Sequence, residues 1–135
     1  MRVEMLDGGW MTASAALWRR DDDPEERARV PVPSYLVETD SERILIDTGL
    51  HPGACADAAA FYGGAATMSL FSLEQERPVC EQVEAATITR IVLTHLHFDH
   101  AGGLSLLPAS IPIVVQRREW EAGGDRGAIE RNFFH

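Results

Sequence analysis

The sequence predicts an α/β domain, because runs of β-branched residues alternate with helical patterns in its second half. Residues 88–93 and 111–115 have the apolar, β-branched character of strands, and residues 104–107 and 117–122 have helical patterns. Strand, helix, strand and helix in this order are typical of an α/β layer. The 135 residues, 45% hydrophobic and 24% charged, suit one compact unit. Because neither a repeat nor a linker interrupts them, we expect a single domain over residues 1–135.

The N-terminal region predicts a hairpin followed by a charged loop. Residues 2–6 and 10–18 resemble strands, and the turn-forming residues Asp7, Gly8 and Gly9 lie between them. Residues 19–29 are almost wholly charged and cannot be buried, so we expect a solvated loop there rather than a segment that guides a substrate.

The next region predicts a second hairpin and a short helix. Residues 35–39 and 43–47 are β-prone runs separated by turn-forming residues. Residues 54–61 are rich in alanine and predict a short helix, which we expect to stop at the glycine pair 63–64.

A loop and an amphipathic helix are predicted before the first strand of the α/β layer. We expect a loop over residues 62–72. The spacing of Val79 and Val83, with glutamates mostly on other faces, predicts a helix over residues 73–86 in which Pro78 can mark the first turn.

Charge and composition exclude several classes of function. The formal net charge of −9 repels phosphate backbones and anionic membrane surfaces, so we expect neither nucleic acid nor a membrane as a partner. All 12 basic residues are arginines, which excludes lysine chemistry such as Schiff bases. Cys55 and Cys80 are too far apart in sequence for a CxxC motif and form no disulfide framework. With no export signal and no apolar run of membrane-spanning length, the sequence predicts a cytoplasmic protein.

The main chemical signal is a cluster of imidazoles and one carboxylate that follows the strand at residues 88–93. Within six residues the chain carries His95, His97, Asp99 and His100. These are ligands that zinc, iron and manganese accept. His95 and His97 can point to one ion at extended spacing, whereas Asp99 and His100 can reach a second ion from the first turn of a helix. The spacing therefore predicts a site for two metals.

This HxHxDH segment resembles the hallmark of the metallo-β-lactamase-fold hydrolases. The segments at residues 35–39, 44–49, 94–103 and 112–121 are similar to the corresponding blocks of N-acyl homoserine lactonases. The resemblance implies an α/β fold, namely the N-terminal half of an αββα sandwich with a mixed sheet and flanking helices. Because it covers only the front half of a family member, it also implies a truncated chain.

The resemblance further implies a site and a reaction. His95 and His97 would bind the first metal, Asp99 and His100 the second, and Asp47 would hydrogen-bond a ligating imidazole from outside the coordination sphere. An alternative for Asp47 is a turn residue that caps the bend after it. Two divalent ions, expected to be zinc, would activate a hydroxide that hydrolyses a small lactone or ester, with Asp99 passing a proton to the leaving alkoxide.

The family's later metal ligands have no counterpart after His100. His51, Asp125 and His135 remain as candidates, but none lies in a matching motif, so we expect them to be surface residues. A non-catalytic metal-binding remnant, or a half-domain that needs a partner chain, is therefore an alternative to the lactonase, as is a thioester hydrolase of the glyoxalase II kind. Because a half-sandwich leaves one face of its sheet uncovered, a homodimer or a complementing chain is also expected.

Overall fold

A six-stranded mixed sheet forms the centre of the computed structural model, which describes residues 1–19, 23–63 and 68–125. The strand order is β4-β1-β2-β3-β5-β6. The strands are β1 (Arg2–Ser14), β2 (Arg27–Glu38), β3 (Arg43–Ile46), β4 (Ser72–Glu74), β5 (Arg90–Leu93) and β6 (Ile113–Val115). The pairs β1–β2, β1–β4 and β2–β3 are antiparallel, whereas β3–β5 and β5–β6 are parallel. This arrangement confirms the predicted α/β class.

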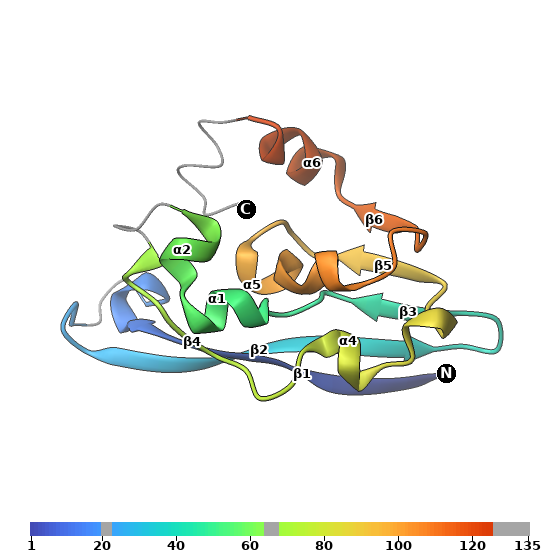
Figure 1. Ribbon diagram of the computed structural model, residues 1–135, viewed down its shortest axis with the longest axis horizontal. Coiled ribbons are helices and arrows are strands. Elements are labelled where there is room, and N and C mark those ends of the chain that lie inside the picture. Colours follow the sequence, from blue (N-terminus) through green and yellow to red (C-terminus); the bar gives the residue numbers. More distant parts are fainter. Residues whose placement is uncertain (20–22, 64–67, 126–135) are drawn as a thin grey trace.

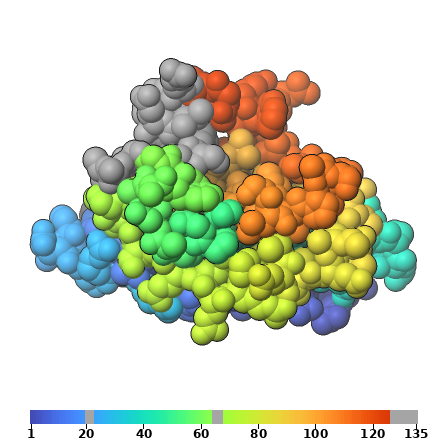
Figure 2. Space-filling model, in the orientation of Figure 1, coloured from blue at the N-terminus to red at the C-terminus, as the bar shows by residue number. Residues whose placement is uncertain are grey.

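Short helices lie over one face of the sheet. They are α1 (Pro52–Ala56), α2 (Ala58–Tyr62), α4 (Val79–Gln82), α5 (Phe98–Ala101) and α6 (Arg117–Gly123), with 3₁₀ turns η1 (Ala15–Leu17), η2 (Ala85–Thr87) and η3 (Gly102–Leu106). In Figure 1, α1, α2, α4 and α5 lie in front of the strands, and α6 lies beside β6. Figure 2 shows how the green, yellow and orange segments together cover the strands. Among the described residues, none of the helices combines the length and apolar character needed to cross a membrane.

The core lies between the sheet and these helices. Leu36 and Leu45 of the central strands are 4% and 0% exposed and pack with Val79 and Leu107 from the helical layer. A second buried cluster joins β1 and β2 to α1 and to Phe98 of α5. Successive side chains of a strand alternate between its two faces, so only one face of each strand contributes to these clusters.

The predicted N-terminal hairpin is wrong, because residues 2–14 form one continuous strand. β1 pairs with β2 along its whole length, and the register shifts between Asp7 and Trp10. Gly9 adopts φ +114°, a conformation that favours glycine, and the glycine pair forms a bulge in the strand rather than a turn. The local turn signal was outweighed by the hydrogen bonds that β2 offers on both sides of the bulge.

The predicted loop over residues 19–29 is only partly correct. Residues 23–26 are exposed and lie outside the strands, but β2 already begins at Arg27, and residues 20–22 lie outside the described residues. The Arg29 guanidinium lies 3.9 Å from the centre of the Trp10 ring and 3.0 Å from Glu74. The charged residues at the start of β2 can form part of the strand because their side chains stay at the surface while their backbone pairs with β1.

The predicted helix over residues 73–86 is also wrong in its first half. Residues 72–74 form β4, which pairs with β1, and α4 is a single turn that begins directly after Pro78. The predicted helix at 54–61 is two short helices separated at Asp57, whose side chain accepts a hydrogen bond from the Ala60 amide. In the predicted loop at 62–72, Met68 is buried and residues 64–67 lie outside the described residues.

The helical pattern at residues 104–107 corresponds to the 3₁₀ turn η3 rather than to an α-helix, and the other predictions agree with the structure. The second hairpin is formed by β2 and β3, with Leu36 opposite Leu45, and Thr39 and Glu42 close the turn. β5, β6 and α6 occupy the predicted strand, strand and helix positions of the α/β layer. In these segments the local pattern and the tertiary environment favour the same structure.

Candidate metal centre

The candidate site lies where the parallel strands β3 and β5 end side by side. Ile46 of β3 is paired with Val92 of β5, and the loops that follow both strands therefore leave the same edge of the sheet. Asp47 follows β3, whereas His95 and His97 lie in the loop between β5 and α5. The first turn of α5 carries Asp99 and His100.

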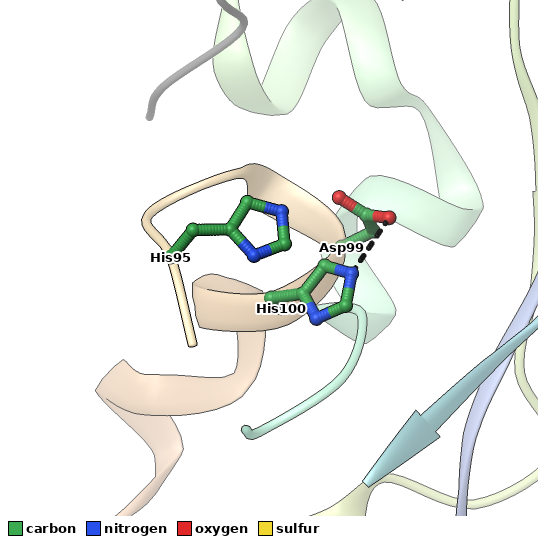
Figure 3. Close-up of side chains that lie close together, drawn as sticks. All are labelled: His95, Asp99 and His100. Atoms are coloured by element: carbon green, nitrogen blue, oxygen red, sulfur yellow. Dashed lines mark ion pairs between the residues drawn. The ribbon is translucent and has the colours of Figure 1, made fainter. Parts of the chain in front are cut away.

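Three of the predicted ligands gather at one point. His95, Asp99 and His100 each offer a ligand atom, and these atoms all lie within 4.8 Å of one another. The His100 Nε2 and Asp99 Oδ2 atoms are 3.4 Å apart, and the centres of the His95 and His100 rings are 4.1 Å apart. Figure 3 shows the three side chains converging from the loop and from α5. Two imidazoles and a carboxylate at this spacing form a set that suits a divalent ion of the zinc type.

His97 lies beside this group but is not a member of it. Its ring packs edge-on against the His95 ring, with 4.5 Å between the ring centres, and it is partly buried. The spacing in the sequence predicted that His95 and His97 would bind the same ion. In the structure, His95 instead offers a ligand atom within 4.8 Å of ligand atoms of both Asp99 and His100. The division of the four ligands between two ions stays a prediction.

Asp47 is buried under the cluster and joins the two loops. Asp47 is only 4% exposed. Asp47 Oδ1 accepts a hydrogen bond from the Thr94 amide at 2.8 Å, and Oδ2 accepts one from the Thr94 hydroxyl at 2.8 Å. The His100 Nδ1 atom also lies 2.8 Å from Oδ2. A carboxylate in this position fixes the orientation of the imidazole and leaves Nε2 directed toward Asp99.

The backbone around Asp47 is held in an uncommon conformation. Asp47 has φ 58°, in the left-handed region that few non-glycine residues adopt. The next residue, Thr48, donates its amide to the His100 carbonyl at 2.7 Å, which ties the loop after β3 to α5. These hydrogen bonds hold Asp47 in its uncommon backbone conformation, and its carboxylate therefore lies beneath the cluster.

The glycine pair after the ligands permits this close approach. A Cβ atom on Gly103 would lie 2.3 Å from the Thr48 carbonyl oxygen, closer than any real contact. The Gly103 amide also donates to the Gly49 carbonyl at 3.0 Å. The absence of a side chain at Gly103 is thus required for α5 and η3 to pack against the loop after β3.

The cluster stabilises a positive charge on one imidazole when no metal is present. Burial alone would lower the pKa of His100, but hydrogen bonds with Asp47 and Asp99 raise it to about 9. Burial would likewise raise the pKa of Asp99, but the hydrogen bond and charge of His100 lower it. His100 and Asp99 therefore form an ion pair near neutral pH, and a bound cation would have to displace the His100 proton.

The other two imidazoles favour the neutral form. Burial lowers the pKa of His95, and the nearby His100 and His97 lower it further. Burial is also the main reason that the pKa of His97 is lowered, although Asp99 and Glu119 act in the opposite direction. A neutral imidazole has a free lone pair, so both side chains are in the form that binds metals.

The remaining candidate ligands lie apart from the cluster. His51 Nδ1 accepts a hydrogen bond from the Gly53 amide at 2.9 Å and caps α1, and its ring stacks on Phe61 at 4.2 Å. His51 is thus a partly buried capping residue rather than the expected surface residue. Asp125 is exposed, as expected, and His135 lies outside the described residues.

Two contacts to the ligand loop have no clear sequence signal. The Thr94 hydroxyl lies between Asp47 and His95, 3.0 Å from His95 Nδ1. Glu119 of α6 accepts a hydrogen bond from the Leu96 amide at 3.3 Å. Thr94 adjoins the motif and could have been suspected from that position, whereas only the tertiary structure brings Glu119 to the loop. Phe98, between the ligands, is buried in the core.

Comparison with known proteins agrees with this geometry. The chain is 35% identical over 105 residues to an N-acyl homoserine lactonase of Bacillus sp., covering 73% of this chain and 42% of the relative. It is 27% identical to the N-acyl homoserine lactonase AttM of Rhizobium johnstonii, covering 98% of this chain and 54% of the relative. The chain thus spans about half the length of these relatives.

The similarity extends to solved structures and to a family model. An N-acyl homoserine lactone hydrolase with N-hexanoyl-L-homoserine at its catalytic metal centre superposes with a TM-score of 0.81 at 26% identity, over 98% of this chain and 53% of that one. The family model of the metallo-beta-lactamase superfamily matches residues 27–123, which is more than half of the sequence. This chain therefore belongs to the metallo-beta-lactamase superfamily.

Proposed function

We propose that this protein is a metal-dependent hydrolase that opens lactone rings, with N-acyl homoserine lactones as the substrate class and quorum quenching as the consequence. The observation that carries the proposal is the convergence of His95, Asp99 and His100 above the buried Asp47 carboxylate. The relatives named above act on N-acyl homoserine lactones, which supports this substrate class for the same cluster of residues.

The residues fit a divalent metal. His95, Asp99 and His100 provide the nitrogen and oxygen ligands that zinc prefers, and Asp47 holds His100 by its other ring nitrogen. We assign His97 to the same centre as a ligand of one of two ions, because its ring contacts that of His95. A bound divalent ion supplies Lewis acidity, which polarises the substrate carbonyl and lowers the pKa of a bound water.

The reaction requires one proton transfer, which we assign to Asp99. In ring opening, a water oxygen bonds to the carbonyl carbon, the ring C–O bond breaks, and the leaving alkoxide oxygen takes a proton. The Asp99 carboxylate, whose pKa is lowered from an already acidic value, is ionised at neutral pH, and we propose that it accepts a proton from the water and passes it to the alkoxide.

An apolar hollow beside the cluster suits the acyl chain of such a substrate. It has a volume of about 590 Å³, and its lining includes Phe61, Tyr62, Leu96 and Leu104. Leu96 lies between His95 and His97 in sequence, so the hollow begins next to the proposed metal centre. Apolar walls with a few polar groups at one end are typical of sites for small amphipathic ligands.

Two experiments in sequence test the proposal. Equilibrium dialysis against zinc should show bound metal in the purified chain. His95→Ala should lose most of it, whereas Glu81→Ala, which removes an exposed carboxylate outside the cluster, should not. Ring opening of N-hexanoyl homoserine lactone, followed by chromatography, should then be lost in His95→Ala and Asp99→Ala but retained in Glu81→Ala. Absence of zinc binding in the unmodified chain would contradict both the metal site and the hydrolase.

A second candidate function is metal binding without catalysis. It is favoured by the ligand set, since the described residues gather three ligands, His95, Asp99 and His100, at one point. Zinc binding that depends on His95, together with no turnover of lactone or thioester substrates, would support it. Turnover of a thioester but not of the lactone would instead favour a hydrolase of the glyoxalase II kind.

The chemistry of the cysteines supports a reducing compartment. Cys55 and Cys80 are both free thiols. Burial raises the pKa of each thiol, which keeps both in the less reactive protonated form. Protonated thiols of low reactivity are compatible with the cytoplasmic location that we propose.

A further inference from the structure

Helix α6 contacts the loop that carries two of the candidate ligands, which we call the ligand loop (residues 94–97, between β5 and α5). Glu119 of α6 accepts a hydrogen bond from the Leu96 amide at 3.3 Å, across 23 positions of sequence. Glu119 is partly buried, whereas its neighbours Arg118 and Trp120 are exposed. One face of α6 is therefore turned toward the ligand loop.

The same face of α6 also meets the side chain of Leu96. Gly123 lies four residues after Glu119 in α6, and residues at this spacing share a face of a helix. A Cβ atom on Gly123 would lie 2.7 Å from Leu96 Cδ1, so the helix backbone lies directly against the Leu96 side chain. The helix thus holds Leu96 at two points, by its amide and by its side chain.

The Leu96 amide lies in the middle of the ligand loop, between two other anchors. At the start of the loop, Asp47 accepts hydrogen bonds from the Thr94 amide and hydroxyl. At its end, the His97 carbonyl accepts from two amides of α5. Because a peptide unit is planar, a hydrogen bond from the Leu96 amide fixes the plane between His95 and Leu96. The contact with α6 therefore constrains the part of the loop that the other anchors do not reach.

The position of Glu119 in its helix does not account for this contact. Gln116 precedes α6, and its side chain accepts hydrogen bonds from the Arg118 and Glu119 amides. A glutamate three residues after the capping residue commonly reaches back to the amide of that residue, as in a capping box. Here Glu119 Oε2 accepts from Leu96, in another segment. Gln116 caps the helix, and the carboxylate of Glu119 serves the ligand loop.

We propose that Glu119 is a positioning residue of the metal centre, which holds the Leu96 amide and so fixes the directions in which the His95 and His97 side chains leave the loop. Among the described residues, the group of converging ligand atoms does not include Glu119, so it acts through the loop and not on the ion. A loop that is ordered before the metal arrives loses less conformational entropy on binding. The inference rests on the proposed metal centre but not on lactone hydrolysis.

The first test is zinc affinity, measured by competition with a chelator. We expect Glu119→Ala to lower the affinity by about tenfold, because the loop loses its central anchor. Glu119→Gln keeps an oxygen that can accept from the Leu96 amide and should retain most of the affinity. Glu121→Ala is the matched control, because it removes the same charge from an exposed side chain of the same helix, and it should have no effect.

Two further measurements report the geometry of the loop rather than turnover. With cobalt(II) in place of zinc, the visible absorption depends on the arrangement of the ligands, so Glu119→Ala should shift the spectrum and Glu119→Gln should restore it. In the metal-free unmodified chain, the Leu96 amide should be protected from hydrogen exchange, measured by NMR. The same amide should exchange faster in Glu119→Ala.

The outcomes separate this inference from the proposed function. If the unmodified chain binds zinc and Glu119→Ala binds it equally well with the same cobalt spectrum, the positioning role is overturned and the metal centre stands. An equal loss in Glu119→Gln, which would assign the effect to charge, or in Glu121→Ala would also overturn it. So would an unprotected Leu96 amide in the unmodified chain, a result that needs no variant to fold. Absence of zinc binding in the unmodified chain would overturn the metal centre and this inference together.

Discussion

At the scale of single residues, the buried carboxylate of Asp47 is the main determinant of the cluster's geometry. It accepts hydrogen bonds from the Thr94 amide and hydroxyl and lies 2.8 Å from His100 Nδ1, so it connects three backbone segments through one side chain. The positive φ of Asp47 is the local cost of this position. We propose that its role is to orient His100 rather than to bind a metal itself.

Replacing this carboxylate should weaken metal binding. In Asp47→Asn one oxygen becomes an amide group, which cannot accept from both the Thr94 hydroxyl and His100. We expect zinc affinity, measured by competition with a chelator, to fall by about 10- to 100-fold. Asp57→Asn is the matched control, because asparagine also caps a helix and α2 should be retained. Equal losses in the two variants would argue against an orienting role for Asp47.

The pKa of His100 predicts a pH dependence for the stability of the metal-free chain. Folding raises this pKa from 6.5 to about 9, so the folded state binds the proton more tightly than the unfolded state. The resulting stabilisation is fully present below 6.5 and is lost as the pH rises through about 9. We expect the free-energy difference between the wild-type chain and His100→Gln, measured by urea unfolding, to shrink over this interval. A difference independent of pH would contradict the Asp47–His100 ion pair.

At the scale of elements, the site depends on the close contact between α5 with η3 and the loop after β3. Thr48 donates to the His100 carbonyl and Gly103 donates to the Gly49 carbonyl, so two backbone hydrogen bonds join these segments. The contact is possible because Gly103 has no side chain. The ligands are therefore held by backbone packing as well as by their own side chains.

A methyl group at this contact should separate the two segments. Gly103→Ala places a Cβ atom 2.3 Å from a backbone oxygen, which cannot move as a flexible side chain could. We expect a loss of about 1–3 kcal/mol in the free energy of unfolding, together with weaker zinc binding. Gly124→Ala serves as the control, since its Cβ would lie no closer than 3.5 Å to another atom. Thermal unfolding with and without zinc measures both effects, and equal stability of the two variants would contradict the packing argument.

At the scale of the whole molecule, the candidate metal centre couples β3, β5 and α5 to one another. A metal that binds the folded chain but not the unfolded chain stabilises the fold by mass action. At a free zinc concentration about a hundred times the dissociation constant, the gain is about 2.7 kcal/mol. We expect zinc to raise the Tm and a chelator to reverse the change.

The same titration distinguishes a specific site from loose binding by acidic side chains. His95→Ala removes a ligand from the cluster and should abolish the rise in Tm, whereas Glu81→Ala removes an exposed carboxylate that is not part of the cluster and should preserve the rise. An equal rise in both variants would show that zinc acts elsewhere on this acidic chain.

The sequence alone determined those features whose physical cause is local. The types and the spacing of the candidate ligands could be identified from the sequence because all four lie within one short segment, namely His95, His97, Asp99 and His100. The hairpin of β2 and β3, the strand β5 and the helix α6 were readable because periodicity and turn residues act over a few positions. The family followed from the same segment, and the family model confirms it.

Tertiary structure alone decided the features that depend on partners distant in sequence. β1 continues through its glycine pair because β2 pairs with it on both sides, and α4 is a single turn because the segment before it pairs with β1 instead. Asp47 reaches His100 across 53 positions because β3 and β5 are adjacent in the sheet. Hydrogen-bond partners and burial in a sheet are set by neighbouring strands, which the order of residues along the chain does not specify.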